Sequence, residues 1–103
     1  MYELEAWGEK EKVKLFKEKY YDGNLAIRID YFDEDMQGWL PYANLTVNLN
    51  CRLNDGCAYV DVNNCPWARE FIEKYNLGVY TGKVCHSGFC VYPLYKFNLD
   101  KLS

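Results

Sequence analysis

The chain has 103 residues, of which half are hydrophobic and 17% aromatic, a composition typical of one folded domain rather than a disordered segment. Twelve basic and fifteen acidic side chains give a net charge of −3. A dedicated binder of phosphate backbones usually carries a basic excess, so we expect no direct nucleic-acid binding. We expect a single domain over residues 1–103.

The lengths of the apolar runs in the sequence indicate in which cellular compartment the protein is expected. Residues 1–19 are highly charged and hold no apolar core of a signal peptide. No stretch approaches the roughly 18 apolar residues that a membrane span needs. We therefore expect a cytoplasmic protein without membrane contact, in a compartment where thiols stay reduced.

Alternation of apolar and polar residues predicts a hairpin in the first third of the chain. Val13 and Leu15 alternate with lysines and lead to a turn at Asp22-Gly23. Residues 24–32 then alternate again, as a half-buried strand requires.

A third and a fourth strand are expected next. Residues 42–50 place four apolar side chains on one face and four polar ones, ending with Asn50, on the other. Asn54-Asp55-Gly56 favours a tight turn, which returns the chain through a strand over 57–62. The four segments together predict an antiparallel four-strand meander.

The period of the apolar residues then changes, which predicts one helix over about 65–77. We expect Asn63 or Asn64 to cap its start and Gly78 to end it. The apolar stripe of this helix consists of Trp67, Ala68, Phe71, Ile72 and Tyr75.

Two further extended segments, 79–86 and 89–98, predict a C-terminal hairpin around a turn at Ser87-Gly88. Thr81-Gly82 is an alternative turn, or Gly82 marks a bulge. The expected fold class is therefore α+β, an antiparallel sheet with one face covered by the helix.

The five cysteines allow two interpretations. A two-residue turn at Ser87-Gly88 places Cys85 opposite Cys90, close enough for a redox pair or for half of a metal site beside His86. Neighbouring residues of a strand point to opposite faces, however, so one ion does not easily take both Cys85 and His86. Alternatively, the thiols are small buried hydrophobic groups. We expect no cofactor and no metal, with a metal- or thiol-dependent function at Cys85, Cys90 and His86 as the alternative.

Acidic residues gather in the middle of the chain. Between residues 30 and 61 six acids stand against Arg52 alone, and Asp33-Glu34-Asp35 is the densest run. This run lacks the spacing and the central glycine of a calcium loop. It is either an acidic face for a basic partner or a solvated loop that keeps the protein soluble.

Ten tyrosines and three tryptophans are many for a small core. Tyrosine and tryptophan are enriched at interfaces, so part of this set is expected either in the core or in a contact surface. Trp39 and Tyr42 flank Pro41 at a strand entrance. The candidate binding residues are therefore Asp33, Glu34, Asp35, Trp39 and Tyr42.

The sequence holds no glycine-rich phosphate cradle and no recognisable nucleophile motif. We therefore expect a protein-binding module rather than an enzyme, with another protein as the partner. A sheet edge can pair between chains, so a monomer and a homodimer both stay open.

Several short motifs occur in a fixed order: Leu45-Thr46-Val47-Asn48-Leu49, Asp61-Val62-Asn63-Asn64, Leu77-Gly78, Thr81-Gly82, Ser87-Gly88 and Tyr92-Pro93-Leu94-Tyr95. Over residues 24–97 they resemble a family of small uncharacterised bacterial domains common on plasmids, phages and integrative elements. That family has no established activity, so the resemblance assigns no functional residue. It implies mobile-element biology, where small acidic proteins often disable host defences such as restriction or CRISPR nucleases. The sharpest form of the protein-binding hypothesis is thus an anti-restriction or anti-CRISPR-like protein.

Overall fold

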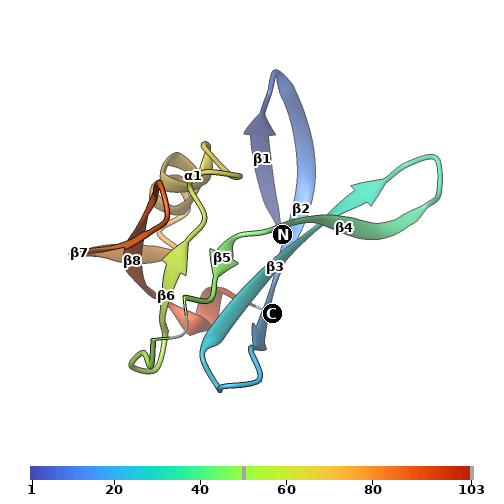
Figure 1. The fold of residues 1–103 in the computed structure, drawn as a ribbon. Helices are drawn as coiled ribbons and strands as arrows, with labels where there is room; N and C mark the ends of the chain where they lie inside the picture. Colours follow the sequence, from blue (N-terminus) through green and yellow to red (C-terminus); the bar gives the residue numbers. More distant parts are fainter. Residues whose placement is uncertain (50, 103) are drawn as a thin grey trace.

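Two four-stranded antiparallel sheets and one short helix make up the fold in the computed structural model, which describes residues 1–49 and 51–102 (Figure 1). The first sheet has the order β1-β2-β3-β4 and the second the order β5-β6-β8-β7. The first sheet consists of β1 (Tyr2–Ala6), β2 (Glu9–Lys19), β3 (Leu25–Asp33) and β4 (Gly38–Asn44). The rest comprises β5 (Thr46–Val47), β6 (Cys57–Val60), α1 (Ala68–Lys74), β7 (Gly78–Ser87), β8 (Cys90–Phe97) and a 3-10 turn, η1 (Leu99–Lys101).

The predicted α+β class is confirmed, because a four-strand meander precedes the helix and a hairpin follows it. Two details differ from the expectation. The meander begins with β1, a strand within the charged start of the chain that we did not predict. The segment expected as one strand over 42–50 is divided between β4 and β5, and β6 pairs in the second sheet. Asn50 lies outside the described residues.

Leu45 is the point at which the chain passes from one sheet to the other. Its N–H donates to the carbonyl of Ile27 in the first sheet at 2.9 Å. Its carbonyl accepts from the N–H of Asp61, which follows β6, at 2.9 Å. The Leu45 side chain is fully buried in the core between the sheets. The predicted alternation therefore continues while the hydrogen-bonding partners change.

The helix is shorter than the expected 65–77, and both of its ends differ from the prediction. Trp67 stands at the N-cap without a side-chain hydrogen bond, so the expected asparagine cap is wrong. The Asn64 N–H instead closes a turn on the Asp61 carboxylate at 3.2 Å. At the other end Asn76, with a φ of +56°, takes the left-handed position expected near Gly78.

The core lies between the inner face of the first sheet, α1 and the inner face of the second sheet. Alternate residues of β2 and β3 point into it, as their pattern predicts. Burying each Leu- or Ile-sized side chain contributes about 1.5–3 kcal/mol, so this layer stabilises a helix too short to persist alone. The central members are Leu4, Val13, Leu15, Ile27, Ile29, Leu45, Val60, Phe71, Ile72 and Leu77.

The first sheet forks at one end. β2 and β3 pair only as far as Val13 and Tyr31. Beyond that pair the β1–β2 hairpin and the β3–β4 hairpin diverge, as Figure 1 shows. Continuing the register would place Glu11 directly opposite Asp33, and like charges in that position destabilise a sheet. The fork therefore keeps two carboxylates apart and leaves a cleft between the hairpins.

Candidate binding cleft at the fork of the first sheet

The cleft at the fork has a volume of about 520 Å³ and is lined from three sides. β1 and β2 supply one wall, β3 the opposite wall, and the turn after β3 the rim. Five carboxylates and two lysines line it, so their formal charges sum to −3, the net charge of the whole chain. The lining residues are Glu3, Lys10, Glu11, Lys12, Tyr31, Phe32, Asp33, Glu34 and Asp35.

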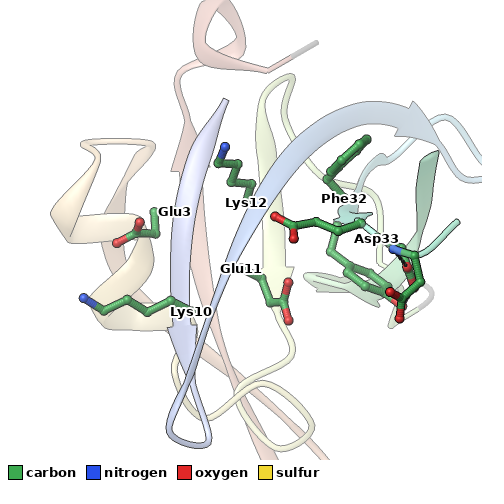
Figure 2. Close-up of a pocket in the computed structure, with 9 residues that line it drawn as sticks. Glu3, Lys10, Glu11, Lys12, Phe32 and Asp33 are labelled. Carbon is green, nitrogen blue, oxygen red and sulfur yellow. Dashed lines mark hydrogen bonds between the residues drawn. The ribbon is translucent and has the colours of Figure 1, made fainter. Parts of the chain in front are cut away.

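Acidic and basic side chains of β2 lie on different sides of this strand at the cleft. Figure 2 shows Glu11 projecting from β2 on the side of Phe32 and Asp33, whereas Lys10 extends away from them, on the side of Glu3. Strand alternation explains this, because successive β2 residues point to opposite faces. The wall that faces β3 is consequently the more acidic one.

Asp33 is the structural member of the acidic run. Its Oδ1 accepts from the N–H groups of Asp35 at 2.9 Å and of Met36 at 3.0 Å, and its Oδ2 accepts from the Tyr31 hydroxyl at 3.3 Å. Burial of Tyr31 and then the charge of Asp33 raise the pKa of that hydroxyl. Asp33 therefore fixes the turn, which holds Glu34 and Asp35 out in solvent at the cleft rim.

Trp39 lies beside the cleft rather than in it. It pairs with Phe32 across β3 and β4, with ring centroids 5.4 Å apart, and the Lys14 ammonium lies 4.5 Å from its ring centroid. Phe32 lines the cleft, so Trp39 supports the cleft wall from the outer face of the first sheet.

Tyr42 belongs to the opposite face of the sheet. Its ring packs on Tyr31 at 5.8 Å and on Trp67 at 6.2 Å. Burial, and then the charges of Glu11 and Glu9, raise the pKa of its hydroxyl. The structure thus brings the three predicted acids together with Phe32 at the cleft. Trp39 and Tyr42 do not line the cleft, but each packs on a ring that does, Trp39 on Phe32 and Tyr42 on Tyr31.

The backbone of the cleft walls is also available for pairing. Residues 9–12 of β2 pair with β1 on one side, and residues 32–33 of β3 pair with β4. Within the described residues no strand pairs with their other sides. Two short strand edges therefore flank the acidic cleft, and an edge of this kind accepts an added strand.

The sequence did not reveal Glu3, Lys10, Glu11, Lys12 and Phe32 as members of the site. Phe32 directly precedes the acidic run, and the other four come from β1 and β2, which are distant from it along the chain. Only the registers of the β1–β2 and β2–β3 pairs bring these four residues to the same end of the sheet as the acidic run. The alternation of β2 was visible in the sequence, but the position of the fork was not.

The C-terminal hairpin corrects the prediction for the cysteines. Its turn is Gly88-Phe89, not Ser87-Gly88, and Gly88 has a φ of +61°. This glycine is the first central residue, the position where a II′ turn takes glycine. Cys85 consequently lies opposite Tyr92 and Cys90 opposite Ser87, so the two thiols do not face each other.

The remaining features of the predicted metal site do not assemble either. His86 lies opposite Val91, and all five cysteines are free thiols. Within residues 1–49 and 51–102 no three His, Cys, Asp or Glu side chains form a group that could hold a metal ion. Cys65 is buried, which raises the pKa of its thiol to about 11.

Comparison with known proteins identifies a family without a described activity. None of the described helices has the length and apolar character needed to cross a bilayer. No curated protein and no solved structure matches the chain. The pattern of one family matches residues 14–103, a range that contains most of the cleft-lining residues and omits β1. The chain belongs to this family, the domain of unknown function DUF4313.

Proposed function

We propose that the chain is a protein-binding module whose acidic cleft at the fork takes an extended, cationic segment of a partner protein. The observation that carries this proposal is the coincidence of five carboxylates with two unpaired strand edges around one cleft. Extended peptides bind sheet edges through backbone hydrogen bonds, while their alternate side chains supply specificity. Lysine and arginine side chains of such a peptide would meet the carboxylates.

The roles of the acids follow from their contacts. Asp33 holds the turn, and its carboxylate is occupied by two backbone N–H groups. Glu34 and Asp35 are exposed at the rim, so they are the groups available for a partner's cations. Charge complementarity of this kind accelerates association and rejects acidic partners.

The partner that we would test first is a host-defence nuclease. A nuclease groove is basic because it binds phosphate backbones, so an acidic protein can occupy it without any catalytic group of its own. The proposal is therefore an anti-restriction or anti-CRISPR-like binder that works in the cytoplasm and is not an enzyme. It draws on the acidic cleft and on the resemblance to mobile-element domains.

A charge-reversal pair tests the cleft. E34K/D35K should weaken binding of a fluorescent peptide of alternating lysine and valine about tenfold or more, since two rim carboxylates become cations. The matched control is D55K/E73K, because both residues are exposed, lie outside the cleft and give the same net charge. Fluorescence anisotropy at low and physiological salt measures the affinity.

The control separates local recognition from general charge. A loss confined to E34K/D35K supports the cleft, and the same variant should then fail to inhibit any nuclease that the wild-type protein inhibits. Equal losses in both double variants would show that only the net charge matters and would overturn the proposal.

A further inference from the structure

Trp7 occupies a position that the fold alone does not explain. Trp7 and Gly8 form the turn between β1 and β2, and both have positive φ values, of 51° and 80°. A two-residue turn of this kind favours Asn-Gly, whereas a bulky residue at positive φ is strained. The Trp7 side chain is nevertheless 69% exposed. The chain thus places a large aromatic ring in solvent at a cost in backbone energy.

Trp7 belongs to a group of three rings from three separate segments. Its ring stands edge-on to Trp67, with centroids 6.3 Å apart and an interplanar angle of 88°. Tyr42 lies 6.2 Å from Trp67. Trp67 directly precedes α1, and in Figure 1 the segment that leads into α1 lies next to the β1–β2 hairpin.

A cavity of about 290 Å³ opens between Trp7 and Tyr42. This volume is near the lower end of the range for small-molecule sites. Besides the two rings its wall includes one carboxylate, that of Asp61, and no lysine or arginine. The complete lining is Trp7, Tyr42, Ala43, Asn44, Asp61, Asn64 and Cys65.

Besides Asp61 in its wall, the cavity has two further carboxylates close to Tyr42. Glu9 and Glu11 are close enough to Tyr42 to act on its hydroxyl. The chain's own cations do not use these rings, since the cation–π contacts found in residues 1–49 and 51–102 involve Phe16, Trp39, Tyr75, Tyr80 and Tyr95. Aromatic faces with nearby carboxylates and no internal cation are the chemistry that recognises an organic cation.

We propose that this cavity binds a quaternary or methylated ammonium group between Trp7 and Tyr42, with Trp67 behind them and Asp61 at the wall. The rings attract the charge through their quadrupoles and cover its methyl groups, which a strongly hydrated ammonium lacks. The cavity is lined by none of the residues that line the acidic cleft, so this inference does not depend on the proposed function.

Nuclear magnetic resonance can test the site, because the three tryptophans give three indole N–H signals. Choline should shift the Trp7 and Trp67 signals saturably and leave Trp39, on the outer face of the first sheet, unchanged. The uncharged isostere 3,3-dimethylbutan-1-ol should shift none of them. Absence of a saturable shift with choline, or an equal response to the alcohol, would overturn the proposal.

Two sources of the cation are distinguished in the same experiment. A short peptide with one trimethyllysine binding at least tenfold more tightly than choline would assign the site to a methylated protein segment. Equal affinities would assign it to a small cation. Either result supports the site itself.

A variant at Trp7 separates the ligand from the fold. W7N places the favoured Asn-Gly pair in the turn, so it should raise the melting temperature while reducing choline affinity at least about tenfold. W39F is the control and should keep the choline response. A Trp67 shift that persists unchanged in W7N would overturn the proposal, because the binding would then not involve Trp7.

Discussion

At the scale of single residues, the backbone of the neighbouring strand β8 restricts residue 78 to glycine. A Cβ at this position would lie 2.8 Å from the Lys96 carbonyl oxygen and 3.2 Å from the Cα of Phe97. Backbone atoms of a paired strand cannot give way as the end of a flexible side chain can. Gly78 is thus required by the close approach of β7 and β8, not by the helix end where the sequence placed it.

Gly78→Ala should therefore lower the free energy of unfolding by about 1–3 kcal/mol, the usual range for overpacking. Gly38→Ala is the matched control, because only the Met36 carbonyl comes near its Cβ, at 3.9 Å. We expect this control to change stability by less than about 0.5 kcal/mol. Urea unfolding followed by tryptophan fluorescence measures both. Similar losses for the two glycines would show that the approach of Lys96 is not the cause.

At the scale of elements, α1 ends in a Schellman motif built on an asparagine. The Leu77 N–H donates to the Ile72 carbonyl at 2.9 Å and the Asn76 N–H donates to the Glu73 carbonyl at 3.2 Å. Leu77 and Ile72 are both fully buried, which supplies the hydrophobic contact of this motif. The end of the helix and the start of β7 are therefore fixed together.

Replacing Asn76 tests this helix end. Asn76→Ala should lower the free energy of unfolding by about 1 kcal/mol, because alanine adopts a positive φ less readily than asparagine does. Asn76→Gly should preserve or raise stability, since glycine has no Cβ penalty there. Thermal unfolding followed by circular dichroism compares the two variants. Equal stability of the alanine and glycine variants would contradict the role assigned to this φ.

The elements also show what a period of two can and cannot predict. Alternation correctly predicted the strand near 24–32, because alternate residues of β3 are buried. The two C-terminal strands were predicted as extended segments on either side of a turn, and β7 is largely exposed. Alternation did not reveal the division at Leu45, because the side chains keep alternating while the backbone changes partner. It missed β1 because only three apolar side chains alternate there among charged ones.

At the scale of the whole molecule, the candidate cleft was only partly visible in the sequence. The acids at 33–35 form a local run and were found. Glu3 and Glu11 join them through strand register, which a single sequence does not display. The period of two already places Trp39 and Tyr42 on opposite faces, so their separation could have been predicted.

One cysteine thiol and three tyrosine hydroxyls that are shielded from water should make the folded protein less stable at alkaline pH. Burial raises the pKa of the Cys65 thiol from its ordinary value of 9.0 to about 11, and burial also raises the pKa of Tyr42, Tyr59 and Tyr95. At a pH between 9.0 and about 11, the Cys65 thiol has lost its proton in the unfolded chain but keeps it in the folded chain. The folded state then binds more protons, so stability falls as pH rises. All four shifts have the same sign, so their effects reinforce one another.

We therefore expect the urea midpoint to be lower at a pH of about 10.5 than at a pH of about 8, with Cys65 contributing on the order of 2 kcal/mol. Cys65→Ala should flatten the pH dependence, even though the cavity it leaves lowers stability at every pH. Cys51→Ala is the control, because this thiol is exposed. Alkylation with iodoacetamide, read by mass spectrometry, should modify Cys51 before Cys65. If the urea midpoint of Cys65→Ala fell with pH as steeply as that of the wild type, the buried thiol would not be the cause of the lower stability at alkaline pH.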